Sequence, residues 1–307
     1  MLDHSEYNLY EIDRELRPSA DSNNRVVPLL ADVKDNDALK SIFDQYKPEV
    51  VFHAAAYKHV HLVEANTPAS ILNNVLGTQN LIEQSQRLNV ERFLLVSTDK
   101  AVNPIGAMGA TKRVCEILTS VAGIKSKKQF SSVRFGNVLG SSGSLIPLLK
   151  EQILNCGPVT LTHPHMNRFF MLIPEAVSLV LMSSALSEPG DINVLRMGDP
   201  IKIVDIAKSL IALMGKTENE IPIVFTGIRP GEKMYEELYI KGDELETRHP
   251  DILTLPKGAT FSHDSSVDYN QAIQDIILLA EQHLPEAKTQ LLKFVLTGSQ
   301  RPVEITH

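Results

Sequence analysis

The sequence predicts an α/β protein built on a doubly wound parallel sheet, with a smaller lobe in the C-terminal half. Three observations support this fold class. Through about residue 135, short apolar runs alternate with amphipathic helical patterns, as in a series of βαβ units. The run EVVFHAAA (49–56) is almost continuously apolar, which is typical of a strand that helices cover on both faces. After about residue 140, loops rich in Gly, Ser, Pro and His replace this alternation.

The individual elements follow from the same patterns. The predicted strands are 25–33, 49–56, 92–98 and 130–138, and the predicted helices are 35–46, 68–89 and 109–122. Asp35 begins the first of these helices and is predicted to be its N-cap, because a carboxylate there accepts a hydrogen bond from a free backbone N–H.

Composition limits the kind of protein. The chain has 307 residues, 43% of them hydrophobic, enough for one large core with an appended lobe. A net charge of -7 argues against a nucleic-acid partner, which needs clustered Lys and Arg. Two distant cysteines indicate no disulfide framework. No apolar run reaches the roughly 18 residues of a membrane span, so we expect no membrane contact in this chain. It would be a cytoplasmic protein, or the cytoplasmic domain of an inner-membrane protein.

One absence affects the domain organisation. Doubly wound dinucleotide-binding folds open with a strand and a G-x-G-x-x-G turn that holds a pyrophosphate, and the sequence contains no such motif. The start MLDHSE instead reads as the end of a second strand, with Asp3 placed to bind a ribose hydroxyl. We therefore expect the first βα unit to be missing. The expected parts are an incomplete dinucleotide-binding domain (1–140), a partly interleaved substrate lobe (141–267) and terminal helices (268–307).

The stretch STDKAVNPIGAMGATK (97–112) has the layout of a dehydrogenase active site, with Ser and Thr after an apolar strand and a lysine one helical turn into the next helix. Position 108, four residues before Lys112, is a methionine where such sites normally have a tyrosine. Further stretches belong to the same pattern: LDHSEYNLYEI (2–12), HAAAYKHVHLVE (53–64), NNVLGTQN (73–80), VRFGNVLGSSGSLIPLL (133–149), MNRFFMLIPEA (166–176) and RPGEKMYEEL (229–238).

On these motifs the chain, from residue 2 to about 255, resembles the nucleotide-sugar 4,6-dehydratases of bacterial polysaccharide and glycan biosynthesis, which are extended short-chain dehydrogenases/reductases. It is similar to their long, membrane-anchored branch, which has methionine at the position of Met108. The resemblance implies a Rossmann-like fold, truncated at its N-terminus, and a homo-oligomer. It also implies NAD as cofactor and a UDP-sugar, UDP-N-acetylglucosamine, as substrate.

The implied reaction is an internal redox cycle. A ketone formed at carbon 4 acidifies the proton on carbon 5, which a base removes while an acid protonates the leaving hydroxyl of carbon 6. The resemblance assigns Asp99 as the acid, Lys100 as the base and Lys112 as a ligand of the nicotinamide ribose. A thioether accepts no proton at neutral pH, so Met108 is expected to fill space. The proton of the 4-hydroxyl is then expected to reach Asp99, directly or through Thr98 or a water molecule.

The remaining site residues are assigned by position in the matched motifs. Asp3 favours NAD over NADP because a carboxylate repels a 2′-phosphate, although NADP stays open. The expected cofactor ligands are Asp3, Asp32, Val33, Ala54, Ala55, Ala56, Lys58, Ser97 and Lys112. The expected ligands of the nucleotide-sugar are Asn137, Ser144, Arg168, Arg229 and Glu232, in which the arginines offer planar, permanently charged donors to phosphate.

Three alternatives stay open at this point. A nucleotide-sugar 4-epimerase is disfavoured because such enzymes use the tyrosine that Met108 replaces. A catalytically silent nucleotide-sugar-binding module is favoured by the missing glycine turn. Within the dehydratases, retention and inversion at carbon 5 are both open. The histidine pairs of KHVH (58–61) and HPH (163–165) have no Cys or carboxylate at ligand spacing, so no metal site is predicted.

Overall fold

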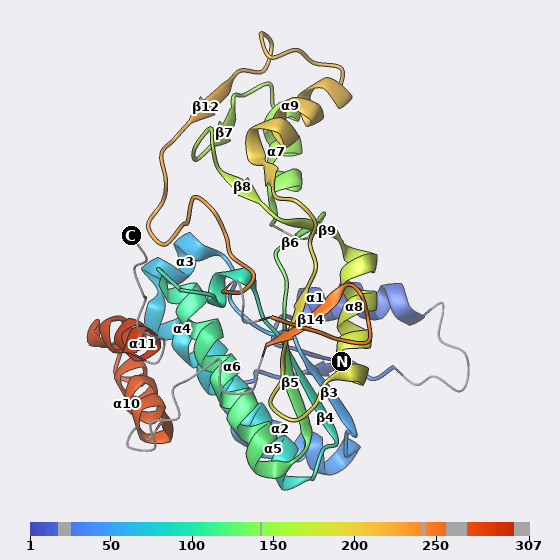
Figure 1. The fold of residues 1–307 in the computed structure, drawn as a ribbon, viewed down its shortest axis with the longest axis vertical. Coiled ribbons are helices and arrows are strands. Elements are labelled where there is room, and N and C mark those ends of the chain that lie inside the picture. Colours follow the sequence, from blue (N-terminus) through green and yellow to red (C-terminus); the bar gives the residue numbers. More distant parts are fainter. Residues whose placement is uncertain (18–25, 142, 241–243, 256–268, 298–307) are drawn as a thin grey trace.

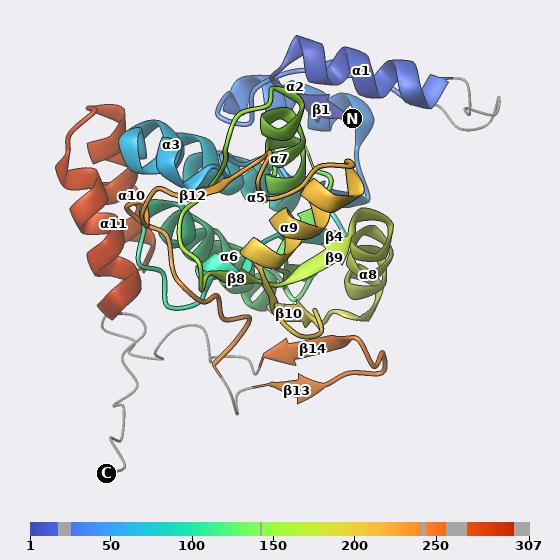
Figure 2. The ribbon, with the colours of Figure 1, turned by 90° about the horizontal axis from the view of Figure 1, so that it is seen from above.

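The computed structural model describes residues 1–17, 26–141, 143–240, 244–255 and 269–297 (Figure 1). Its centre is a six-stranded sheet in the order β13-β14-β10-β5-β4-β3. The strands are β3 (Val50–His53), β4 (Arg92–Val96), β5 (Gln129–Arg134), β10 (Ile192–Leu195), β13 (Leu245–Glu246) and β14 (Ile252–Leu255). β3, β4, β5 and β10 are parallel, while β14 and β13 add antiparallel at one edge (Figure 2). The predicted α/β class with a parallel sheet is confirmed.

The N-terminal strands stand apart from this sheet. β1 (Leu2–Asp3) and β2 (Leu29–Leu30) pair in parallel only with each other in the described part of the chain, with α1 (Glu6–Leu16) between them in sequence. In the same described residues β3 pairs on one side only, with β4, and Phe52 is 47% exposed. This interruption between β1 and β3 is what a parallel sheet without its first βα unit predicts.

Several predicted elements are confirmed with shifted bounds. α2 (Asn36–Tyr46) begins after Asp35, whose Oδ1 accepts a hydrogen bond from the Ala38 N–H at 2.9 Å, so the predicted N-cap is correct. The predicted helix 109–122 is α6 (Ala107–Ser126). The predicted helix 68–89 consists of α4 (Thr67–Ile71), the π-helical turn η2 (Leu72–Leu76) and α5 (Gly77–Arg87).

All four strand predictions were too long. The predicted strands 49–56 and 92–98 are β3 and β4, which end at His53 and Val96. Of the predicted strand 25–33, only Leu29–Leu30 is strand, because these are the residues that find a partner in β1; residue 25 lies outside the described part. The predicted strand 130–138 divides into β5 and β6 (Asn137–Leu139). β6 leaves the sheet and pairs with β9 (Phe170–Leu172) of the lobe.

Helices cover both faces of the sheet (Figure 1). On one face, α2, α4, α5, α6 and the C-terminal helices α10 (Tyr269–Glu281) and α11 (Glu286–Thr297) form a continuous apolar core, which includes Phe93 and Phe130. On the other face α8 (Ile173–Leu186) packs over Leu94 and Val133. The side chains of β4 and β5 thus alternate between the two cores, as a strand covered on both faces requires.

The lobe has a core of its own, in which Leu149, Val159 and Ile211 are buried. Its elements are α7 (Leu145–Leu154), β7 (Val159–Leu161), β8 (Asn167–Arg168), β9, β11 (Ile201–Lys202), α9 (Ile203–Leu213) and β12 (Ile223–Phe225). The chain returns from the lobe to the sheet for α8, β10, β13 and β14. The predicted boundary at 267 lies outside the described residues. Among those residues, no helix combines the length and apolarity needed to cross a bilayer.

Candidate active site

A cavity of about 370 Å³ opens where β3, β4 and β5 end, between the sheet and the lobe. Parallel strands bring their carboxyl ends to one edge of the sheet, and ligands of such folds bind there. The predicted site residues that line this cavity are Ala54, Ala56, Lys58, Ser97, Thr98, Lys100, Met108, Lys112, Asn137 and Ser144. The fold therefore brings together at one cavity residues that lie up to about 90 positions apart in the sequence.

Lys100 lines this cavity, whereas Asp99, next to it in sequence, is buried and does not line the cavity. β4 ends at Val96, and a single 3₁₀ turn, η3 (Asp99–Ala101), follows, with Thr98 as its N-cap. Asp99 is fully buried, and its Oδ1 accepts hydrogen bonds from Thr98 Oγ1 at 2.8 Å and Lys100 Nζ at 3.0 Å. Within the described residues, Asp99 Oδ2 has no hydrogen-bond partner. The turn therefore supplies a carboxyl group with an unused oxygen and an adjacent amine.

The start of α6 completes this side of the cavity. The carboxylate of Glu64, in α3 (Val60–Ala65), accepts a hydrogen bond from the Ala107 N–H at 2.5 Å and so holds the helix N-terminus. Met108 and Lys112 are one turn apart and both line the cavity. At Gly109 a Cβ atom would collide with the backbone carbonyl oxygen of Lys100. Glycine therefore allows α6 to approach η3 closely.

Lys112 lies under the cavity in a buried position. Its Nζ donates a hydrogen bond to the Val96 carbonyl oxygen at 2.9 Å. Burial lowers the pKa of Lys112 from its ordinary value, and Cys115 and Glu116 oppose that shift by favouring the charged form. The amine is thus fixed at the end of β4, where it can also face a ribose in the cavity.

Glu116 anchors a paired network beneath the cavity. It accepts hydrogen bonds from Ser97 Oγ at 2.6 Å, from Arg134 Nε and Nη2 at 2.7 and 2.6 Å, and from Arg113 Nη1 at 3.2 Å. Burial alone would raise the pKa of Glu116, but Arg134 and the other partners hold it below its ordinary value. The hydroxyl of Ser97 is thus engaged below the cavity, in a network that ties β4 and β5 to α6.

A second cavity of about 200 Å³ continues from the first. The two share Ala54, Ala56 and Tyr57, and the second reaches Asp3, Val33 and Ala55. Asp3 ends β1, with Oδ1 accepting a hydrogen bond from the Ser5 N–H at 2.7 Å. Small alanines between the cavities leave room for an extended ligand. The residues present fit the adenosine and ribose part of a dinucleotide, with a carboxylate at one end and Lys112 at the other.

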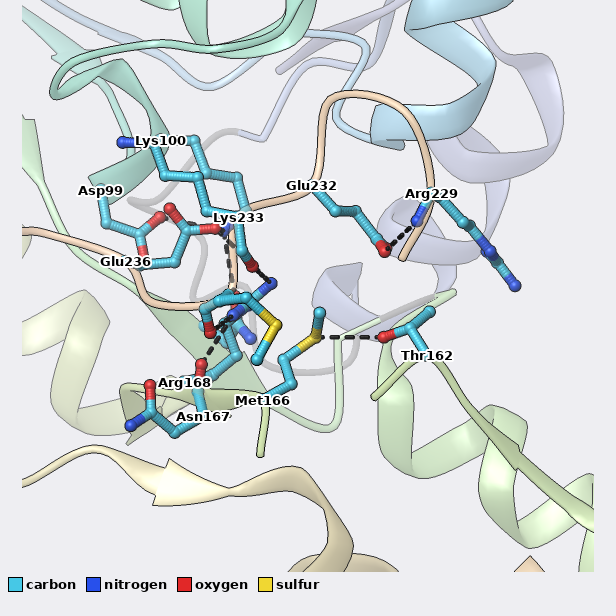
Figure 3. A network of polar contacts seen from close by, with 12 residues as sticks. Asp99, Lys100, Thr162, Met166, Asn167, Arg168, Arg229, Glu232, Lys233 and Glu236 are labelled. Atoms are coloured by element: carbon cyan, nitrogen blue, oxygen red, sulfur yellow. Dashed lines mark hydrogen bonds and ion pairs between the residues drawn. The ribbon is translucent and has the colours of Figure 1, made fainter. Parts of the chain in front are cut away.

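Other predicted ligands lie outside both cavities. Asp32 pairs with Lys34 at 3.2 Å. Arg229 is exposed and points away from Lys100, and its N–H donates a hydrogen bond to Glu232 Oε2 at 3.2 Å (Figure 3). Arg168 is buried and donates hydrogen bonds to backbone carbonyl oxygens of the loop after Arg229, to Lys233 O at 2.8 Å and Met234 O at 3.1 Å.

Only some of the residues predicted to bind the nucleotide-sugar therefore line the cavity. Asn137 and Ser144 line the first cavity, and the buried Ser144 Oγ has no partner among the described residues. Asn137 Oδ1 accepts a hydrogen bond from Lys100 Nζ at 3.5 Å. The phosphate and ribose contacts predicted for Arg168, Arg229 and Glu232 stay predictions, and these three residues do not reach the cavity in the structure.

The sequence analysis missed Glu236. This carboxyl group is buried, and its Oε1 lies 3.8 Å from Lys100 Nζ and 3.7 Å from Arg168 Nη2 (Figure 3). It belongs to the stretch RPGEKMYEEL, but the pattern does not tell which of Glu236 and Glu237 turns inward. The analysis also missed Tyr57, His59, Phe135 and Phe170, which line the cavity. Across the described residues, no three His, Cys, Asp or Glu side chains gather as metal ligands.

Comparisons with known proteins bear on the family and the fold of this chain. A family model described as "Polysaccharide biosynthesis protein" matches residues 1–257. The chain is 51% identical over 244 residues to the capsular polysaccharide biosynthesis protein CapD of Staphylococcus aureus, covering 79% of this chain and 41% of that protein. It therefore spans about two fifths of the length of this curated relative.

Solved structures show the same fold. Pen from Bacillus thuringiensis is 31% identical with a TM-score of 0.76, covering 92% of this chain and 88% of Pen. DesIV, a dTDP-glucose 4,6-dehydratase of Streptomyces venezuelae solved with NAD bound, is 19% identical with a TM-score of 0.65, covering 78% and 76% of the two chains. At that identity DesIV supports the fold alone.

Proposed function

Because this chain belongs to the polysaccharide biosynthesis protein family, we propose that it is an NAD-dependent UDP-N-acetylglucosamine 4,6-dehydratase. Its product would be a UDP-4-keto-6-deoxy-N-acetylhexosamine for a surface polysaccharide or glycan. The groove from Asp3 to Lys112 in this chain supports the choice of cofactor.

The observation that carries the proposal is the Asp99–Lys100 pair, in which Lys100 lines the cavity and donates a 3.0 Å hydrogen bond to the buried Asp99. Elimination of water across carbons 5 and 6 needs one acid and one base within reach of adjacent carbons. Asp99 and Lys100 satisfy that need, because their hydrogen bond holds the amine and the carboxyl group together. A hydride transfer without elimination would need no such pair.

The cofactor, when bound, would accept hydride from carbon 4 and return it to carbon 6. Asp3 would bind a ribose diol and Lys112 the other ribose. Asp99 would take the proton of the 4-hydroxyl, directly or through Thr98, and give it to the leaving hydroxyl of carbon 6. Lys100, as the neutral amine, would remove the proton of carbon 5 and later return it. Asp99 Oδ2, which is buried and has no protein partner among the described residues, would take the proton of the 4-hydroxyl.

Met108 is compatible with the assignment of all proton transfers to Asp99 and Lys100. Its side chain is 5% exposed and lines the cavity beside Lys112, where a tyrosine would stand in related sites. A thioether moves no proton, so it disfavours a 4-epimerase that depends on that tyrosine. The second candidate, a silent nucleotide-sugar-binding module, is favoured by the interrupted sheet between β1 and β3.

Proton NMR of UDP-N-acetylglucosamine with NAD in D2O tests the proposal. The chain is compared with a variant that carries a grafted first βα unit. A new sugar methyl signal, with deuterium at carbon 5, is the expected result. Binding of the UDP-sugar by both proteins without any methyl signal would support the silent module. Lys100→Ala should abolish the methyl signal, and its persistence would refute Lys100 as the base.

A further inference from the structure

Two buried glutamates near the cavity differ in how they are paired. Glu116 has short hydrogen bonds from two arginines and a serine, and its pKa lies below its ordinary value. The nearest cationic atoms to Glu236 Oε1 are at 3.8 and 3.7 Å, beyond hydrogen-bond reach, and Glu236 Oε2 has no partner among the described residues. An ionised carboxylate is costly to bury without hydrogen bonds, so this site favours the neutral acid.

Four charged groups face Glu236 (Figure 3). Asp99 and Lys100 come from η3, Arg168 from β8, and Lys233 from the loop of Glu236 itself. Burial raises the pKa of Glu236; Lys100 opposes this shift, Asp99 adds to it, and Arg168 and Lys233 oppose it. The net direction is upward, so the carboxyl group holds a proton more readily than an ordinary glutamate.

The loop that carries Glu236 is held firmly in place. Arg168 donates hydrogen bonds to the backbone of Lys233 and Met234, and Lys233 Nζ donates one to Val102 O at 2.7 Å, just after η3. The neighbours of Glu236 therefore hold it beside Lys100, while its carboxyl group has no hydrogen bond within the described part of the chain. Its side chain is 2% exposed, so solvent does not compete for the carboxyl group.

Lys100 must be neutral to act as a base although a carboxylate lies beside it, and a second acceptor such as Glu236 can take its proton. A base at carbon 5 must be the neutral amine, but the carboxylate of Asp99 lies 3.0 Å from Lys100 Nζ and attracts positive charge. A cavity of about 10 Å³, which is about the space of one water molecule, is lined by Lys100, Met108 and Glu236. Lys100 and Glu236 thus both line this small space.

We propose that Glu236 is a positioning residue for the reaction, which takes the ammonium proton of Lys100 and leaves the neutral amine facing carbon 5. The inference rests on the proposed function. One N–H bond of Lys100 breaks and one O–H bond of Glu236 forms, so an ion pair becomes a neutral pair without change in total charge. After Lys100 has returned its proton to carbon 5, Glu236 returns the stored proton to Lys100. No net proton is consumed.

Glu236→Gln tests this role, with Glu237→Gln as the matched control. Glu237 is the neighbouring residue, half exposed, and lies 3.7 Å from Lys233 Nζ. In the protein that forms product, E236Q should lower kcat at pH 7 by about tenfold or more, with KM changed less than about twofold. The rate of E236Q should recover as pH rises, because hydroxide then removes the Lys100 proton that Gln cannot accept. E236D should restore part of the rate, and E237Q should behave as wild type.

An infrared difference spectrum between wild type and E236Q gives a readout without turnover. It should contain the carbonyl stretch of a protonated carboxylic acid at neutral pH, which shifts on isotopic labelling of glutamate. Absence of that band, a wild-type pH profile in E236Q, or a rise in KM at unchanged kcat would each overturn the proposal. A wild type that forms no 4-keto-6-deoxy product would refute the proposed function itself, and the role of Glu236 with it.

Discussion

Acid should destabilise this protein through His53, the last residue of β3. The side chain is 2% exposed, and Nε2 lies at hydrogen-bond distance, 2.9 Å, from Thr78 Oγ1. Burial, and secondly the charge of Lys112, lowers the pKa of His53 from 6.5 to about 3. A lowered pKa in the folded state means that the unfolded chain binds the proton first. The stability contributed by neutral His53 is therefore complete above pH 6.5 and is lost as pH falls from 6.5 toward 3.

The magnitude follows from the shift. The difference between 6.5 and about 3 is 3.5 pH units, which corresponds to about 5 kcal/mol, fully lost only below pH 3, at about 1.4 kcal/mol per unit. By pH 5 the loss should be about 2 kcal/mol. A loss of that size is a large fraction of a typical domain stability.

Urea unfolding at a series of pH values between 7 and 4 measures this loss. His53→Gln keeps a polar group near Thr78 but cannot be protonated, so its free energy of unfolding should be lower at pH 7 and should fall less steeply with acid. His165→Gln changes an exposed histidine and should keep the wild-type slope. Equal slopes in wild type and H53Q between pH 6.5 and 5 would refute the reasoning.

Three further substitutions test the site. Met108→Tyr should be tolerated, with product formation within about tenfold of wild type, because methionine only fills space there; a severe loss would mean that the pocket is shaped around the thioether. Gly109→Ala should lower the free energy of unfolding by about 1–3 kcal/mol, and with it the melting temperature, and should also slow product formation, because the added Cβ collides with the carbonyl oxygen of Lys100. An unchanged melting temperature and an unchanged rate would contradict the close approach of α6 to η3. Glu116→Gln should cost about 3–5 kcal/mol in denaturant unfolding by leaving Arg134 buried without its carboxylate, and a cost below about 1 kcal/mol would show that the arginine finds another partner.

Local patterns were sufficient for the elements that lie close together in sequence. Asp35 is recognisable as a cap because capping joins residues three apart, and the structure contains that hydrogen bond. The four-residue spacing of Met108 and Lys112 places both on one helical face, and both line the cavity. Asp99 and Lys100 follow an apolar strand, so their place at the edge of the sheet is also a local property.

Contacts between residues far apart in the sequence could be identified only from the tertiary structure. Arg168 is an evident phosphate ligand in isolation, yet its guanidinium holds the backbone of residues 233–234. β13 and β14 join the main sheet, although their sequence stands among the loops of the lobe. In these cases the partner lies tens of residues away, and no local period encodes the choice.

The sequence by itself determined the α/β class, the strand-end position of the Asp99–Lys100 pair and the loss of a tyrosine at Met108. Only the tertiary structure decided which buried charges are paired. Glu116 and Glu236 are both buried glutamates near the same cavity. Glu116 is hydrogen-bonded to two arginines, whereas the cations nearest to Glu236 lie beyond hydrogen-bond distance. The protonation of a buried carboxyl group depends on the distances to its neighbours, and those distances exist only after the chain has folded.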